Sequence, residues 1–285
     1  METADELDRA AEVQGASGAG IQPAGYLLEL SLDWIVLRAP ENIHHLLAES
    51  HVTMIDEPLG RFVHGQALHD LRNLFSRLSG TTGIGRAYAI RLTDDPDLVD
   101  VSFQLRNGRV LLEAVPSTGS FGESFGSVGG LVAGLSNASG QALLDGGVRR
   151  MRALTGYDRV TLTCGDHRAE SSRGAFSVRA NLSDDVPPIV ADAAAELLEL
   201  FPHDVEETSA QHALLRSCSG SALQALRNEG VKACLRVPFS VDDVVGEFRC
   251  DSRTARNPSF ELHAAAELFA QLFAMRLELD NLKNG

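Results

Sequence analysis

Residues 99–114 read VDVSFQLRNGRVLLEA, and the fold expected for the chain is built outward from this stretch. Two runs suited to strands, 99–105 and 110–114, flank the dipeptide Asn107-Gly108. Both turn residues tolerate positive φ, which a tight two-residue hairpin turn requires. The stretch therefore predicts two antiparallel strands that pair directly with each other.

The segment before this hairpin predicts a mixed domain of strands and helices. Leu68, Leu71 and Phe75 recur at helical spacing, which is typical of one buried helix face. The elements expected here are strands at 27–30, 34–37 and 87–92 and helices at 41–48 and 66–78. Two strands, small helices and a three-stranded meander form the element order of a PAS domain.

Beyond the hairpin, residues 116–126 (PSTGSFGESFG) predict a linker because turn-forming residues dominate them. Residues 127–154 predict a helix, although each of its glycines costs about 1 kcal/mol relative to alanine. These glycines either weaken the helix or allow another helix to approach closely. A second mixed domain is expected at 157–255, with strands at 157–163, 175–180, 231–239 and 244–250 and helices at 187–200 and 214–228. This is the element order of a GAF domain.

A long helix is expected at the C-terminal end, over residues 258–283. Its apolar residues fall at the alternating spacing of four and three that makes a heptad seam: Leu268, Leu272, Met275, Leu279 and Leu282. Such a seam favours pairing with the same helix of a second subunit. The alternative is a helix that only packs on its own domain, because two heptads are fewer than a confident coiled coil needs.

Composition limits the partners. The 285 residues carry a formal net charge of -14, and an acidic surface repels the phosphates of nucleic acids. No apolar run approaches the length of about 20 residues that a membrane span needs. Residues 1–20 are acidic and then rich in glycine and alanine, so they predict a mobile arm and not a signal peptide. We therefore expect a cytoplasmic protein that binds neither nucleic acid nor membrane.

Residues for catalysis or metal binding are not arranged in any familiar pattern. The chain has no GxGxxG after a strand, no GxxxxGK[ST], no HExxH and no GxSxG. The four cysteines have no metal-type spacing, and the nine histidines are scattered. The sequence therefore predicts a sensory or regulatory module that is not an enzyme and has no metal site.

Several short motifs nevertheless resemble one family in their order along the chain. They are IQPAG at 21–25, TGYDRV at 155–160, DVP at 185–187, LRS at 215–217 and LRNEGVKA at 226–233. Together they resemble the PAS–GAF part of a bacterial phytochrome photosensory core, whose motifs read IQPHG, TGFDRV, DIP and LRSxSPxHxxYLRNMGVRAS.

The resemblance implies an α+β fold of two domains, PAS-like and then GAF-like. Each would be an antiparallel sheet with flanking helices, and long helices would join them. The expected divisions are a flexible arm at 1–20, a PAS-like domain at 21–116, a linker and connecting helix at 117–156, a GAF domain at 157–256 and a signalling and dimerisation helix at 257–285.

In this family the GAF pocket holds a linear tetrapyrrole, and the present sequence departs from the family at the pigment. Bacterial members attach the pigment to a cysteine ahead of IQPHG, but residues 1–20 contain none. Other members use a cysteine directly before the histidine of SPxH. The replaced pocket positions are Ser221 and Ala222 in that motif, Ser252 at a second histidine and Thr163 at a tyrosine.

Some pocket residues of the family are kept. The resemblance implies that Asp185, with Val186 and Pro187, would offer a main-chain carbonyl to the pyrrole nitrogens, and that Arg216 would bind a propionate. Both also have structural alternatives, a helix cap for Asp185 and a surface ion pair for Arg216. Ile21 would lie inside a loop that the N-terminal arm threads in the family, although the stretch from Asp185 to Arg216 is shorter here.

These observations favour a phytochrome-like module that has lost covalent pigment attachment and acts as a homodimer through its C-terminal helix. No cofactor is expected under this interpretation. A first alternative is a working photoreceptor that binds biliverdin or another linear tetrapyrrole without a covalent bond, or through Cys218 or Cys250. A second is a GAF domain that binds another small ligand.

Overall fold

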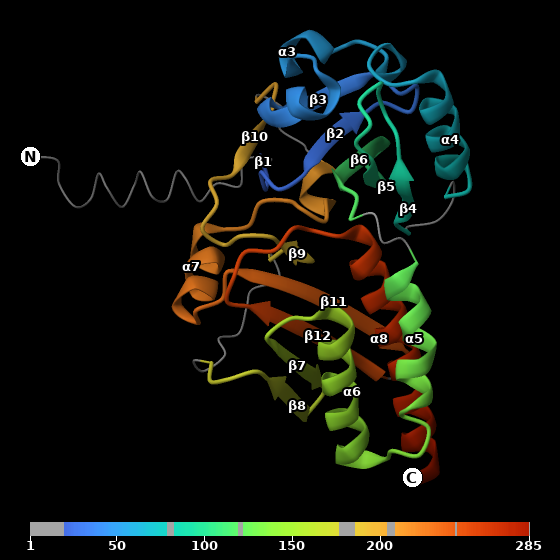
Figure 1. Cartoon of the computed structure of the whole chain (residues 1–285), viewed down its shortest axis with the longest axis vertical. Coiled ribbons are helices and arrows are strands. Elements are labelled where there is room, and N and C mark those ends of the chain that lie inside the picture. Colours follow the sequence, from blue (N-terminus) through green and yellow to red (C-terminus); the bar gives the residue numbers. More distant parts are fainter. Residues whose placement is uncertain are drawn as a thin grey trace, which may run out of the picture.

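The computed structural model describes residues 20–78, 83–118, 122–176, 186–203, 209–242 and 244–284. Two antiparallel sheets stand one above the other, and long helices run along one side of the second sheet (Figure 1). The expected α+β class is confirmed. The expected flexible arm lies outside the described residues except for Gly20. In the described part of the chain, no helix is long and apolar enough to span a membrane.

The first sheet contains the predicted meander. Its strands are β1 (Gly20–Ile21), β2 (Tyr26–Leu30), β3 (Val36–Pro40), β4 (Gly85–Ile90), β5 (Val99–Arg106), β6 (Arg109–Pro116) and β10 (Leu198–Phe201), in the order β1-β10-β3-β2-β6-β5-β4. Asn107 and Gly108 have φ angles of 49° and 71°. Both residues at the tip of the β5–β6 hairpin are therefore left-handed, which confirms the turn predicted from the sequence.

Short helices and one longer helix pack on this sheet. They are η1 (Glu41–Ile43), α2 (His44–Leu47), α3 (His51–Met54), η2 (Leu59–Arg61) and α4 (Gly65–Ser76). The helix predicted at 66–78 is confirmed as α4, and Leu71 on its inner face is fully buried. The helix predicted at 41–48 is divided into η1 and α2, and it ends where Ala48 adopts the left-handed conformation.

The long helices are α5 (Glu123–Ala133), α6 (Gly140–Thr155) and α8 (Phe260–Asn284). The prediction of a single helix over 127–154 is therefore wrong, because two helices, α5 and α6, occupy this range. The linker predicted at 116–126 already contains the start of α5. The division falls before Gly140, whose positive φ of 51° does not suit a helix interior.

The sequence did not decide whether the glycines of this segment weaken the helix or allow another helix to approach closely. Two glycines of α6 allow a close approach. A Cβ on Gly147 would lie 2.5 Å from Cε2 of Phe273 in α8, which is closer than any real contact. A Cβ on Gly146 would lie 2.8 Å from Cδ2 of Leu135. Glycine therefore lets α6 pack directly against the phenylalanine face of α8.

The second sheet has the order β8-β7-β12-β11-β9. Its strands are β7 (Arg159–Cys164), β8 (His167–Ser172), β9 (Ile189–Val190), β11 (Ala233–Val241) and β12 (Val244–Ser252). The strand predicted at 175–180 is wrong for Ala175 and Phe176, and its remainder lies outside the described residues. β7 pairs with β12 on one side and, on the other, with β8, which follows it across a tight turn.

The helix predicted at 187–200 is wrong. Its two ends form β9 and β10. The first of these strands pairs with β11 in the second sheet, whereas β10 pairs with β3 and β1 in the first sheet. Alanine and leucine favour helix locally, but the free edges of both sheets offer hydrogen bonds that only an extended chain can make. Tertiary pairing therefore overrides the local preference.

The helix predicted at 214–228 is shorter than expected. Leu214 and Leu215 form a turn, residues 216–219 are not helical, and α7 covers only Gly220–Asn228. The Ser219 hydroxyl accepts a hydrogen bond from the Ala222 amide at 3.2 Å, so Ser219 caps the helix. The segment before α7 pairs with the N-terminal segment, because the amide of Gln22 donates to the carbonyl of Leu215 and the amide of Ser217 donates to the carbonyl of Gly20.

Candidate functional site

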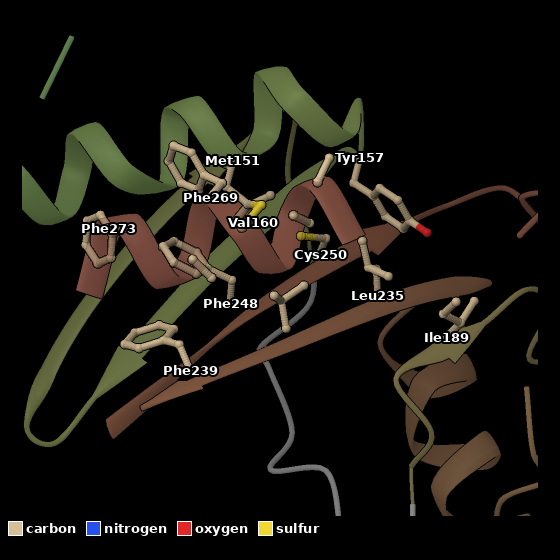
Figure 2. Packing of buried hydrophobic residues seen from close by; sticks show 14 of the residues in the cluster. Met151, Tyr157, Val160, Ile189, Leu235, Phe239, Phe248, Cys250, Phe269 and Phe273 are labelled. Atoms are coloured by element: carbon tan, nitrogen blue, oxygen red, sulfur yellow. The ribbon is translucent and has the colours of Figure 1, made fainter. Parts of the chain in front are cut away.

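The two faces of the second sheet have opposite character, and β12 shows the contrast. Phe248 and Cys250 point to the helix side, where they join Phe269 and Phe273 of α8 in one apolar cluster (Figure 2). Successive side chains of a strand point to opposite faces, so Arg249 on β12 points away from the helices. The candidate site lies on this second, charged face.

Four charged side chains are buried together on that face. They are Arg159 of β7, Glu229 at the end of α7, and Arg249 and Asp251 of β12, each at most 4% exposed. Nη2 of Arg159 lies 2.7 Å from both Oε2 of Glu229 and Oδ2 of Asp251. Arg249 reaches the same two carboxylates, at 2.9 Å and 2.7 Å. We call these four residues the charge cluster.

The surroundings of Arg249 favour its charged form. Burial by itself disfavours the guanidinium of Arg249, but the acidic groups around it, including Asp251 and Glu229, outweigh this and raise its pKa above the ordinary value. Phe176 covers Arg159, with the guanidinium carbon 4.5 Å from the ring centre. The cluster therefore pairs two guanidiniums with two carboxylates, and the ring of Phe176 covers one of the guanidiniums.

Next to the charge cluster, α7 closes over a small apolar cluster. Its buried members are Val186, Val190, Ala193, Ala222, Leu226, Val231 and Cys234. Ala222 is 4% exposed, so the position expected for a pocket histidine is packed among aliphatic groups. Cys218 and Leu223 pack against this cluster from the side.

The structure distributes the other expected pocket residues over different surroundings. Ser221 is exposed on α7, and its hydroxyl lies 3.0 Å from that of Ser219. Ser252 is buried at the end of β12 and contacts Oδ2 of Asp158 at 3.5 Å. Thr163 is half-buried on β7. Val186 and Pro187 are buried, and Asp185 lies outside the described residues.

The cysteines differ in their access to a ligand. Burial raises the pKa of the Cys250 thiol, and likewise that of Cys234. Cys250 also lies on the helix side of the sheet, away from the charged face (Figure 2). Cys218 is half-buried beside α7, and the other three cysteines of the chain are buried. Because the thiolate is the reactive form, Cys218 is the better placed of the two proposed attachment residues.

Ile21 and Arg216 do come together. They form an isolated antiparallel bridge, and Ile21 is fully buried between this bridge and β10. Gln22 links both sides, because its Nε2 donates to the carbonyl of Ile189 at 2.6 Å and its Oε1 accepts from the amide of Ala191 at 2.7 Å. The N-terminal segment is thus held between two arms of the chain at 189–201 and 215–217.

The side chain of Arg216 forms hydrogen bonds to main-chain carbonyls next to the bridge with Ile21. Its guanidinium donates to the carbonyl of Ala213 at 3.3 Å and to that of Val186 at 3.4 Å. These contacts tie the segment before α7 to the part of the chain just ahead of β9. The side chain is half-buried, so it lies within reach of solvent near the apolar cluster.

Comparison with solved structures places this fold beside chromophore-binding domains of phytochromes. The chromophore-binding domain of Stigmatella aurantiaca phytochrome P1 has a TM-score of 0.73 at 22% identity, over 93% of this chain and 98% of that one. The chromophore-binding domain of an unusual bacteriophytochrome from R. palustris also has a TM-score of 0.73, at 21% identity, over 95% and 98%. The two-sheet architecture of this chain is therefore that of a phytochrome chromophore-binding domain.

Longer structures match as well. The bacteriophytochrome structure of R. palustris has a TM-score of 0.78 at 22% identity, and the match covers 94% of this chain and 59% of that one. No protein-family model and no curated protein matched the sequence. The likeness therefore defines the fold of this chain.

The charge cluster was missed by sequence reasoning. A signal was present, because Glu247, Arg249 and Asp251 alternate with apolar residues along one strand. The carboxylate of Glu229 could not be placed there, since it follows a helix distant in sequence. Within the described residues, no group of three histidine, cysteine or acidic side chains is arranged to hold a metal ion.

Proposed function

We propose that the chain is a phytochrome-like sensory module that has lost covalent bilin attachment and works as a dimeric regulatory protein. The charge cluster is the observation that carries this proposal. The resemblance sets the pigment against the sheet face that holds Thr163, and Arg159 lies four residues earlier on the same strand and hence on the same face. That face is occupied by ion pairs that are already satisfied.

The chemistry of the replaced residues supports the same proposal. A buried tetrapyrrole presents ring nitrogens and propionates, and an unsatisfied buried polar group costs about 1–3 kcal/mol. Ala222 offers no hydrogen bond from its side chain, and Ser221 points to solvent. Opening the charge cluster to admit a pigment would also leave buried charges without partners.

A spectrum tests the proposal. The full chain is co-expressed with a source of biliverdin, purified, and examined by absorbance before and after red light, then denatured and inspected for zinc-induced fluorescence. We expect neither a photoswitching red band nor a fluorescent adduct. A stable covalent adduct that switches with light overturns the proposal, and a bacteriophytochrome carried through the same steps is the positive control.

A second candidate function, attachment of a pigment through Cys218, rests on its half-buried place beside α7. The matched pair of variants Cys218→Ser and Cys164→Ser distinguishes it from the first. If Cys218 is the attachment residue, the adduct disappears in Cys218→Ser and persists in Cys164→Ser, because Cys164 lies in the core on the helix side. The first proposal expects no adduct in either protein.

The dimer is proposed to form through α8. Leu268, Met275 and Leu279 are 43%, 54% and 55% exposed, although they are large and apolar. Leu272 on the same seam is half-buried, and the side chain of Leu282 lies outside the described residues. The opposite side of α8 is filled by its own domain, so the seam is left for a second copy of the helix.

A further inference from the structure

A cavity of about 250 Å³ lies where several parts of the chain meet. Thr118 just after β6 and Ser124 in the first turn of α5 border it, and Ser259 and Leu262 border it from the start of α8. Leu235 of β11 closes it from the second sheet. The cavity lies away from the charge cluster, because Leu235 points to the helix side of that sheet (Figure 2).

One side of the cavity is apolar. Ile189, Leu235 and Leu262 line it, and the first two are at most 3% exposed. Tyr157 adds its ring, and burial raises the pKa of the phenol, which is therefore neutral at physiological pH. A ligand with a short apolar body can bury that body against this side of the cavity.

The other side of the cavity is polar and has no acidic side chain among its lining residues. Arg256 is its one cationic side chain, and Asn257 and the hydroxyl residues Thr118, Ser124 and Ser259 lie around it. The nearby carboxylate of Glu261 is engaged elsewhere, since it accepts from the amides of Gly122 and Ser124 at 2.9 Å and 3.3 Å. In a chain of net charge -14, such a lining is unusual and suits an anion.

Arg256 is held in place before any ligand arrives. Its Nη1 donates to the carbonyl of Gly156 at 2.7 Å, and its guanidinium carbon lies 4.4 Å from the ring centre of Tyr157. A guanidinium has five N–H donors in a planar fork that matches a carboxylate. A side chain fixed in this way loses little conformational freedom when it binds.

His263 completes the lining without adding charge. Burial lowers its pKa to about 4, so the imidazole is neutral at physiological pH. Nη2 of Arg86 lies 2.9 Å from its Nδ1, and the carboxylate of Glu267 lies 3.8 Å from its Nε2. Arg86 belongs to β4, so the wall of the cavity also connects α8 to the first sheet.

We propose that this cavity binds a small monocarboxylate with a short apolar body. The carboxylate would face Arg256 and the surrounding hydroxyl groups, and the body would lie on Leu235 and Leu262. The volume is below the range of about 300–1,000 Å³ for drug-sized ligands, which favours a molecule of metabolite size. Because the ligand would touch both the start of α5 and the start of α8, its binding would stabilise one arrangement of the two helices.

Benzoate is a suitable probe, with benzamide as its uncharged match and inorganic phosphate as an anion without an apolar body. Each is titrated into the full chain by calorimetry, and amide shifts are followed by two-dimensional NMR. We expect saturable benzoate binding at about millimolar affinity. Shifts should concentrate at residues 122–124 and 257–263, and benzamide should bind at least about tenfold more weakly because it lacks the charge that Arg256 recognises.

Three variants locate the site. Arg256→Gln removes the cation, Leu262→Phe fills the apolar side, and Arg61→Gln removes an exposed arginine of η2 as the matched control. Benzoate affinity should fall at least about tenfold in the first two and stay unchanged in the third. If Arg256→Gln fails to fold, Leu262→Phe alone tests the site.

Three results overturn the proposal: no saturable binding up to about 10 mM benzoate, equal binding of benzoate and phosphate, or equal loss of binding in the Arg61→Gln control. The titrations contain no bilin, so their outcome is independent of the function proposed for the charged face.

Discussion

At the scale of single residues, the charge cluster is a closed set of contacts. Each carboxylate, of Glu229 and of Asp251, contacts both guanidiniums, so no member depends on a single partner. A complete buried network is tolerated, whereas a broken one leaves a charge without compensation. This makes the cluster costly to open, which supports the proposal that a large polar ligand does not displace it.

The first prediction concerns Asp251. Replacing Asp251 by Ala leaves Arg159 and Arg249 with Glu229 as their shared carboxylate within the cluster, and the free energy of unfolding should fall by about 3–5 kcal/mol. Urea denaturation followed by circular dichroism measures this. Glu57→Ala, which removes the partner of the exposed Arg61, is the control and should change little. A loss in Asp251→Ala no larger than in the control contradicts the account.

Glu113 of β6 is a second buried acid, and it has a different setting. Its two oxygens accept from the amides of Leu214 and Leu215, both at 2.9 Å, so the first sheet holds the segment before α7. Burial raises its pKa to about 7, against the hydrogen bonds from these two amides and the positive charges of Arg86 and Arg216.

The second prediction follows from this raised pKa. The native state holds the Glu113 proton up to about pH 7, while the unfolded state releases it near 4.5, so Glu113 stabilises the fold below 4.5 and this contribution is lost as pH rises through 7. Glu113→Gln does not titrate. The free energy of unfolding of the wild type relative to Glu113→Gln should therefore decrease by about 3 kcal/mol between pH 4.5 and pH 8. A difference that stays constant with pH contradicts the prediction.

At the scale of elements, α8 has one buried side and one exposed apolar side. Phe269, Phe273 and Ala270 are fully buried against the second sheet and α6, while Met275 and Leu279 remain exposed. A helix that is apolar on nearly all sides is normally buried on nearly all sides. The rest of its own chain buries only part of the apolar surface of α8. A second copy of α8 would cover the rest.

The third prediction tests that interface. The double variant Met275→Glu with Leu279→Glu places four like charges at a two-fold interface, so the dimer should dissociate at least about tenfold more readily than the wild type. Sedimentation equilibrium measures the association. Val245→Glu is the matched control, because Val245 is 62% exposed on β12 and lies off the seam. An unchanged dimer in the double variant, or no dimer in the wild type, contradicts the proposal.

At the scale of the whole molecule, the two sheets share one hydrophobic cluster. Leu27 and Leu111 of the first sheet belong to the same cluster as Leu214, Leu235 and Phe269. Charged contacts add to it, since Nη2 of Arg86 on β4 lies 2.8 Å from Oε2 of Glu267 on α8. The first sheet is also completed by β10, which arrives from the second half of the chain.

The fourth prediction is that the chain unfolds in a single cooperative transition. Separate domains would melt separately, but here neither sheet retains its full core without the other. Scanning calorimetry should give a calorimetric enthalpy equal to the van't Hoff enthalpy. Arg86→Ala should lower the transition temperature without dividing the transition. Two resolved transitions in the wild type contradict the shared core.

The amino-acid sequence by itself determined the local elements and their order. The Asn107-Gly108 turn, the meander, α4, the β11–β12 hairpin and the heptad seam of α8 follow from backbone preferences and side-chain period, which act over a few residues. The order of five short motifs also indicated the family whose fold was found. These features could be predicted because their causes lie close together in the chain.

Only the tertiary structure decided what the segment 187–219 becomes and how the candidate site is filled. Its alanines and leucines favour helix, yet β9 and β10 are extended because sheet edges and Gln22, more than 160 positions away, supply the hydrogen bonds. The charge cluster likewise joins Arg159, Glu229 and Asp251 from separate elements. Such contacts depend on which surfaces meet after folding, and no local pattern of residues specifies that meeting.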